Sequence, residues 1–232
     1  MPGIKLEEML PHELEAAVAR FPVAYCAFGS IEWHGKHLAV GNDTLKAYHL
    51  LLMTAEKYGG VVVPPTYWGV LGAWHPWTSS GLGETITELL YRRVFECLVE
   101  IGFRVVIGVT GHDVPPQREA IQKAVDAIRH NSGAAGFAMM EGDFYDLTED
   151  RMDHAAHWET SLLMYLRPEL VDMTQIAGED LETEAGRTEA GIYGQDPRQH
   201  ASAALGKTIA EGISDWIGKQ AQELVAEVGS PR

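Results

Sequence analysis

Short, fully apolar segments alternate with longer amphipathic segments along this chain of 232 residues. Continuous apolar runs indicate strands that are buried on both faces, and we predict them at 23–28, 60–63, 104–109 and 136–140. Apolar residues at helical spacing predict helices at 11–21, 42–57, 84–101, 115–130, 157–166 and 204–228. Strands that alternate with helices predict an α/β fold, a three-layer α/β/α sandwich around a largely parallel sheet. The length suits one large domain, so we expect residues 1–232 to form a single domain.

Two of these helices, and one later segment, carry more specific expectations. Asn42 or Asp43 is placed to cap the helix at 42–57. Residues 174–200 are polar, acidic and rich in glycine, which favours an excursion near the surface. In the helix at 84–101, one apolar stripe is expected to face the core, formed by Ile86, Leu89, Leu90, Val94, Cys97, Leu98 and Ile101.

The charge balance argues against several classes of protein. The net charge is −15, with 33 acidic and 18 basic residues, whereas binding to nucleic acid or to an anionic membrane needs clustered Lys and Arg. No apolar run approaches the ~18 residues of a membrane span, and four glutamates in residues 1–20 argue against a signal peptide. Cys26 and Cys97 lie far apart and provide no disulfide framework. We therefore expect a cytoplasmic protein.

Three polar clusters follow predicted strands, at the sheet edge where ligands of α/β proteins collect. They are Glu32, His34 and Asp43 after the first strand, His112 and Asp113 after the third, and His154, His157 and Glu159 after the fourth. Each residue alone has a structural explanation, since Asp43 can cap a helix and a histidine can be a hydrogen-bonded structural residue. Three separate clusters at one edge favour a shared site.

The residue types in these clusters suit a metal centre. Glu32 and His34 point to the same side if the chain between them is extended. Imidazole and carboxylate ligands bind zinc, and also manganese or iron. Asp43 has two oxygens and could bridge two metals ~3.5–4 Å apart, where a metal-bound water would be the nucleophile. His37 lacks a partner at useful spacing, so we expect it to support the site.

The segment 68–83 contains three tryptophans and a histidine without regular periodicity. Such a loop could fold back and bury its aromatic rings, or it could form the wall of a pocket. On the second interpretation the substrate pocket is lined by Trp33, Trp74, His75, Trp77 and Asp113.

Several motifs together resemble the creatininase (creatinine amidohydrolase) family. The segment "GSIEWHGKHLAVGNDTLKA" is similar to a family signature with Glu-Gln-His-Gly, His-Leu-Pro and Thr-Asp. "HPWTSSGLGETITELL" resembles a Phe-Pro-Gly-Thr-Ile-Ser-Leu segment, and "TGHD" stands where the family has Asn-Gly-His-Gly-Gly-Asn. "HAAHWETSLLMYLRPELVDM" is similar to a His-Ala-Gly-Glu-x-Glu-Thr-Ser helix, and "GIYGQDPRQHASAALGKTIAEG" to a late Gly-Asp-Pro segment. The matches run in order over most of the chain.

The resemblance implies two divalent metal ions per chain, zinc, manganese or iron. It implies that Glu32, Asp43 and His112 hold one metal, and that His34 and a bridging Asp43 hold the other. The acidic residue that completes the second site in the family falls on Val114 or His157 here, and His157 could substitute as a nitrogen ligand. The resemblance also implies that His154 is a general acid, that Glu159 supports the site, and that the chain forms a homo-oligomer, a hexamer or similar.

The departures from the family pattern cluster at the pocket. Trp33 replaces Gln, and Ala39 replaces Pro. The Gly-Gly-Asn of the family is replaced by Asp113, Val114 and Pro115. The Phe and Gly of the family are replaced by His75 and Trp77. We therefore expect a metal-dependent hydrolase that uses a metal-bridging hydroxide to cleave a C–N amide-like bond, possibly cyclic, in a small polar metabolite other than creatinine.

Three alternatives stay open at this point. The first is a metal-dependent hydrolase or lyase acting on a keto-sugar or keto-polyol. The second is an inactive family member that binds a small ligand or serves as a subunit of an assembly. A mononuclear iron oxygenase fits less well, because its two-histidine, one-carboxylate triad usually lies in a β-barrel.

Overall fold

A computed structural model describes residues 3–70, 77–144 and 153–229. Its strands are β1 (Val23–Phe28), β2 (Val61–Val62), β3 (Val105–Thr110) and β4 (Ala135–Met140). They form one parallel sheet in the order β2-β1-β3-β4, in which Val23 pairs with Val105 and Val105 pairs with Ala135. The parallel sheet and the predicted strand positions are thus confirmed to within a residue or two at each end.

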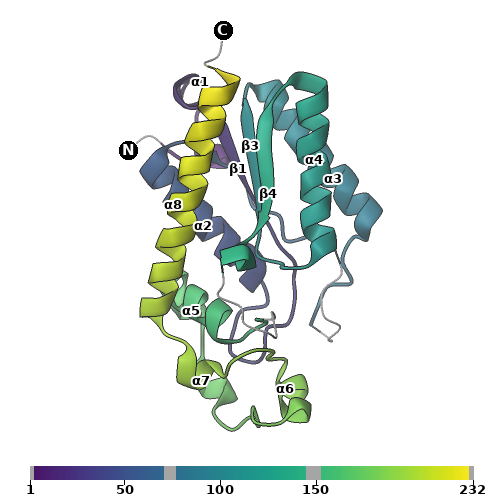
Figure 1. Ribbon diagram of the computed structural model, residues 1–232, viewed down its shortest axis with the longest axis vertical. Helices are drawn as coiled ribbons and strands as arrows, with labels where there is room; N and C mark the ends of the chain where they lie inside the picture. Colours follow the sequence, from purple (N-terminus) through teal and green to yellow (C-terminus); the bar gives the residue numbers. More distant parts are fainter. Residues whose placement is uncertain (1–2, 71–76, 145–152, 230–232) are drawn as a thin grey trace.

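Helices cover both faces of this sheet (Figure 1). One face packs against α1 (Pro11–Arg20), α3 (Glu84–Ile101) and α4 (Pro115–Ser132). The other packs against α2 (Asn42–Tyr58), α5 (His157–Leu166) and α8 (Ala203–Val228). The remaining helical segments are short: η1 (Leu6–Glu8), η2 (Glu141–Phe144), η3 (Pro168–Leu170), η4 (Met173–Ile176), α6 (Glu184–Ala190) and α7 (Pro197–His200). The fold is the predicted three-layer α/β/α sandwich.

The alternation of side chains along the strands explains why these strands are apolar throughout. In β1, Val23, Tyr25 and Ala27 enter the core beneath α2 and α8. Their neighbours Ala24, Cys26 and Phe28 enter the core beneath α3 and α4. Because successive residues of a strand point to opposite faces, a strand with helices on both sides must be apolar at every position.

Two of the detailed predictions for helices differ from the structure, and the stripe of α3 is right only at Leu98 and Val94. In α3 the buried residues are Thr87, Tyr91, Phe95 and Leu98, whereas Leu89 is 66% exposed. The helix carries a second apolar stripe, and its aromatic rings reach Phe28, with centroid distances of 4.2 Å to Tyr91 and 6.1 Å to Phe95. Tyr91 and Phe95 are fully buried against Phe28, so the face of the helix that carries these rings is the one that packs against the sheet.

The cap of α2 also differs from the prediction. Gly41 occupies the N-cap position, and Asn42 and Asp43 are the first two residues of the helix itself. Both side chains are buried. Asp43 is therefore available for another role, because it does not cap the helix.

The polar segment at 174–200 lies at the end of the molecule that contains the carboxyl ends of the strands (Figure 1). It includes η4, α6 and α7, and it buries Ile176, Ala190 and Ile192 against Leu38 and Leu163 in a third apolar cluster. The excursion therefore has a small core of its own. In the described residues, no helix combines the length and the apolar character that a membrane span needs.

Candidate metal centre

Four of the predicted ligands converge at the carboxyl ends of β1 and β3. Glu32 and His34 lie in the loop after β1, Asp43 lies in the first turn of α2, and His112 follows β3. Each of the four residues is at most 3% exposed. Parallel strands end at the same sheet edge, so loops distant in sequence meet there, as the sequence predicted.

Close backbone packing brings α2 to this edge. A Cβ atom on Gly111, next to His112, would lie 2.2 Å from the carbonyl oxygen of Asp43. A Cβ atom on Gly29 would lie 2.4 Å from Thr44 Oγ1. Only glycine allows the loops after β1 and β3 to approach the start of α2 so closely.

The side chains form three possible ligand groups, two of which share Asp43; the third consists of Glu32, His34 and His154. The two groups that share Asp43 are called the first and the second group below. In the first group, His112 Nδ1 lies 3.0 Å from Glu32 Oε2 and 3.2 Å from Asp43 Oδ2. In the second group, His34 Nε2 lies 2.9 Å from Asp43 Oδ1 and 3.4 Å from Glu159 Oε2. Within each group the possible ligand atoms all lie within 4.8 Å of one another. The two oxygens of Asp43 thus face different groups.

These residues fit divalent metal ions. Neither oxygen of Asp43 makes a hydrogen bond of good geometry within the described part of the chain, although both are buried. Buried polar atoms are normally satisfied by hydrogen bonds or by an ion. Carboxylates and imidazoles that converge on common points are the donor sets of zinc and of related transition metals.

The electrostatics of the cluster also favour a bound cation. Burial lowers the pKa of His112, but the close, negatively charged carboxylates of Asp43 and Glu32 outweigh burial and raise that pKa to about 10. Burial opposes the charged form of Asp43 as well, yet His34 and His112 hold its pKa far below the usual range. Protons on the imidazoles therefore balance the carboxylates in the absence of a cation, and metal binding would release them.

Glu159 lies in the second ligand group, where the sequence assigned it only a supporting role. Its Oε2 accepts a hydrogen bond of 2.6 Å from the backbone N–H of Ala155. Its Oε1 accepts a hydrogen bond of 2.6 Å from Lys46 Nζ, and Lys46 also forms an ion pair with Glu141. Lys46 and Glu141 are fully buried.

The sequence reasoning missed Lys46 and Glu141, although the sequence contains a signal for each. Lys46 follows Asp43 by one helical turn and lies on the apolar side of α2, next to Ala47 and Leu50. Glu141 directly follows β4, so the rule that identified the other ligands applies to it too.

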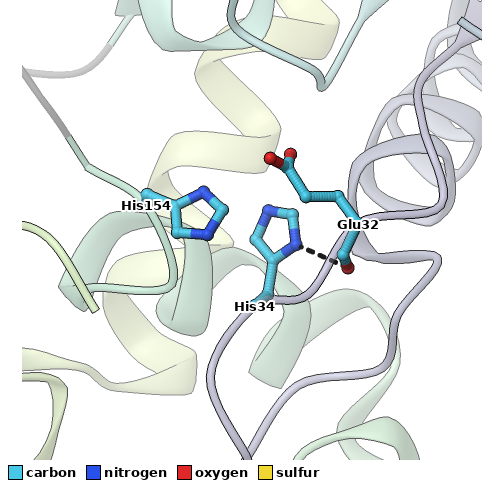
Figure 2. A group of neighbouring side chains, drawn as sticks. All are labelled: Glu32, His34 and His154. Carbon is cyan, nitrogen blue, oxygen red and sulfur yellow. Dashed lines mark hydrogen bonds between the residues drawn. The ribbon is translucent and has the colours of Figure 1, made fainter. Parts of the chain in front are cut away.

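His154 stands at the edge of the cluster, beside His34 (Figure 2). Its ring centroid lies 4.3 Å from that of His34. Its Nε2 lies 2.9 Å from the carbonyl oxygen of Trp33, an acceptor, so Nε2 carries the proton and donates it. Burial, and then the nearby His34, lower the pKa of His154. The next residue, Ala155, has a φ of 53°, a left-handed conformation that is unusual for alanine and marks a constrained turn.

His157, the predicted substitute ligand, belongs to none of the three ligand groups of the described residues. Its Nδ1 lies 3.3 Å from a carboxylate oxygen of Asp153, and its ring packs on Trp158 with a centroid distance of 4.5 Å. Val114 is the N-cap residue of α4 and offers no ligand atom from its side chain. Glu159 is therefore the acidic residue that the structure places in the second group.

The predicted pocket residues have different surroundings. Trp33 is 9% exposed and its ring contacts that of Trp77, which is 59% exposed, at a centroid distance of 6.1 Å. Asp113 Oδ2 accepts a hydrogen bond from the backbone N–H of Gly142, and burial and the charge of Glu141 raise the pKa of Asp113. Trp74 and His75 lie outside the described residues.

His37 is buried behind the second ligand group. Its Nε2 lies 3.0 Å from Thr160 Oγ1 in α5, the residue that follows Glu159. Burial lowers the pKa of His37 to about 4, so the ring is neutral at pH 7.

An α/β/α sandwich that gathers buried carboxylates and imidazoles at the carboxyl end of its sheet has the arrangement that a metal-dependent hydrolase needs. The model of the Creatininase family, described as creatinine amidohydrolase, matches residues 7–220, and the chain belongs to this family. It is an enzyme of the metal-dependent amidohydrolase type.

Two characterised relatives share part of the sequence. A creatinine amidohydrolase from Pseudomonas putida is 26% identical over 194 residues, which cover 73% of this chain and 74% of the relative. A mycofactocin precursor peptide peptidase from Mycolicibacterium smegmatis is 30% identical over 156 residues, which cover 64% of this chain and 59% of the peptidase.

Solved structures match over nearly the whole chain. A crystal structure of creatinine amidohydrolase (creatininase) superimposes with a TM-score of 0.82 at 21% identity and covers 100% of both chains. A creatininase named as Creatininase Mn superimposes with a TM-score of 0.81 at 21% identity, over 95% of this chain and 98% of that one. A creatininase mutant named as the Zn-Zn type has the same TM-score and identity, over 96% and 98%. At this level of identity the match shows the fold.

Proposed function

We propose that the chain hydrolyses a C–N amide-like bond of a small polar substrate at a centre of two divalent metal ions, and that residues 1–232 form one catalytic domain. The observation that carries this proposal is the position of Asp43. Its two oxygens face two separate ligand groups, 2.9 Å from His34 and 3.2 Å from His112. A carboxylate in this position is suited to bridge two metals.

The two groups divide the ligands between them. Glu32, Asp43 and His112 would hold one ion, and His34, Asp43 and Glu159 would hold the other. The donor set suits zinc, manganese or iron. Two such ions supply Lewis acidity, which lowers the pKa of a water molecule and polarises the carbonyl group of the substrate.

His154 is suited to move the proton in this reaction. The carbonyl oxygen of Trp33 holds the Nε2 proton, so Nδ1 is left as the proton acceptor of the neutral ring. This nitrogen can take a proton from the attacking water and return it to the leaving nitrogen. A positioned general acid–base group of this kind contributes about 10²–10⁴-fold to a rate.

The substrate is proposed from the chemistry that the relatives share. One relative is named for creatinine and the other for a precursor peptide, and both names describe cleavage of a C–N bond next to a carbonyl carbon. Trp77 presents aromatic surface and packs against the buried ring of Trp33 where the pocket is expected. We propose a small cyclic amide or a short peptide end, not creatinine, as the substrate.

A substrate screen tests the proposal. The purified chain is supplied with zinc, manganese or iron and offered cyclic amides, short peptides, creatinine and keto-polyols, with Asp43→Ala as the control. We expect metal-dependent release of an amine from one of the amides. Turnover of keto-polyols alone would favour a hydrolase or lyase that acts on keto-polyols. No turnover of any compound would favour an inactive family member that binds a small ligand.

We also propose that the chain forms a homo-oligomer, a hexamer or similar. The outward side of α3 supports this, because four large apolar side chains of this helix are exposed: Ile86 (58%), Leu89 (66%), Leu90 (37%) and Ile101 (47%). Light scattering coupled to gel filtration measures the mass directly, and a monomer would contradict the proposal.

A further inference from the structure

The second ligand group lies beside two buried charged residues, Lys46 and Glu141, to which the proposed hydrolysis assigns no role. Lys46, on α2, is fully buried and contacts two carboxylates, Glu141 and Glu159. Glu141 is also fully buried, and Glu159 is 3% exposed. A lysine in such a place is costly, because burial removes the hydration of its ammonium group.

Lys46 has more partners than charge neutrality requires. Glu141 alone would balance the charge of Lys46, yet Lys46 Nζ also lies 2.6 Å from Glu159 Oε1. The other oxygen of Glu159 accepts a hydrogen bond of 2.6 Å from the N–H of Ala155 and lies 3.4 Å from His34 Nε2. Both oxygens of Glu159 are therefore held, and a lone pair of Oε2 stays available on the side of His34.

This anchoring matters because the second ligand group depends on Glu159. Besides the shared Asp43, the carboxylate of the first group is that of Glu32, and the carboxylate of the second group is that of Glu159. A glutamate side chain has several rotatable bonds, so an unanchored carboxylate would lose conformational entropy when it binds a metal. Outer partners that orient a ligand typically contribute about 10- to 100-fold to metal affinity.

We propose that Lys46 is a positioning residue that fixes Glu159 as the carboxylate ligand of the second metal, with Glu141 as the counter-ion of Lys46. This inference rests on the proposed two-metal function. When the charge of Glu159 is engaged by a metal, Glu141 keeps Lys46 neutralised. Lys46 thus acts through Glu159 and does not itself contact the metal or the substrate.

A charge-balanced double variant separates positioning from simple neutralisation. Lys46→Met with Glu141→Gln removes one positive and one negative charge, keeps similar side-chain volumes, and leaves Glu159 without its Oε1 partner. The matched control is Lys57→Met with Asp215→Asn, which removes an exposed ion pair of α2 and α8, on the same helix as Lys46 but away from the site.

Metal binding is measured by titration of the apo-protein with Zn²⁺ against a competing chelator, and with Co²⁺ by its visible absorption. We expect two equivalents in the wild type and in the control. In the double variant we expect the first equivalent unchanged and the second weakened by about 10-fold or more, with an altered cobalt spectrum for the second equivalent. Glu141→Gln alone should weaken the second equivalent less than the double variant does.

Each other result is decisive. If the affinity for the second metal equivalent is unchanged in the double variant, the role of Lys46 is refuted and the two-metal proposal still stands. The same conclusion follows if Glu141→Gln alone abolishes binding of the second equivalent. Fewer than two equivalents in the wild type overturns the two-metal proposal itself. If the double variant does not fold, a crystal structure of the metal-loaded wild type decides, because Glu159 must bind metal through Oε2 while Lys46 holds Oε1.

Discussion

The two ligand groups share Asp43 but are built in different ways. The first consists of residues in the loops after β1 and β3 and at the start of α2: Glu32, His112 and Asp43. The second takes Glu159 from inside α5, and its carboxylate is oriented by Lys46 from another helix. Strand ends thus define the first group, whereas the second depends on how two helices are rotated against the sheet.

The largest effect is expected where the two groups meet. Asp43→Ala should remove both metals and lower activity by about 1000-fold or more, since losing several kcal/mol of transition-state stabilisation has this effect. The fold should persist, because Asp43 does not cap α2. Elemental analysis and turnover on the substrate found in the screen measure the outcome, with the exposed Asp215→Ala as control. Wild-type metal content together with full activity would refute the bridging role.

His154 tests whether proton transfer can be separated from both ligand groups. His154→Gln should lower turnover by about 10²–10⁴-fold while two metals stay bound. A loss of metal equal to the loss of activity would show instead that His154 is a ligand, consistent with its proximity to Glu32 and His34.

Single-ligand variants test the difference between the groups directly. His112→Ala should weaken only one equivalent of metal and Glu159→Gln only the other, each by about tenfold or more. Competition titrations, with anomalous diffraction to locate the remaining ion, distinguish the two variants. If both variants lost the same equivalent, the division into two groups would be incorrect.

The smallest effect concerns acid stability on the side of α5. His37 has a pKa of about 4 in the folded protein and about 6.5 when unfolded. The unfolded state therefore binds the proton more tightly, so His37 stabilises the fold fully above pH 6.5 and this contribution is lost as the pH falls towards 4. The loss is about 2–3 kcal/mol.

Urea unfolding at pH 7 and pH 4.5 measures this dependence. His37→Gln, which retains a hydrogen-bonding group near Thr160, should show a flatter pH profile than the wild type between these values. An identical profile in the variant would place the acid sensitivity elsewhere.

The sequence predicted the strands and four ligands because both depend on local, strong signals. A strand covered on both faces must be apolar throughout, as β1 is, and the residues that follow parallel strands must meet at one edge. This reasoning predicted that Glu32, His34, Asp43 and His112 lie together, as they do, and the family resemblance pointed to the same residues as candidate ligands.

The rest depends on helix rotation, which a single sequence specifies poorly. His157 and Glu159 are two residues apart in α5, so they project about 200° apart around the helix. Which one faces the site depends on the packing of α5 against its neighbours. The face of α3 that is turned to the core was also predicted wrongly. Tyr91 and Phe95 form a second apolar stripe beside the predicted one, and the sequence does not show which stripe is buried.

Anomalous diffraction at the zinc and manganese absorption edges tests the central claim most directly. Crystals of the metal-loaded wild type should show two peaks close together, one among Glu32, Asp43 and His112 and the other among His34, Asp43 and Glu159. A single peak, or a second peak beside His157 and Asp153 with none at Glu159, would contradict the two-group centre.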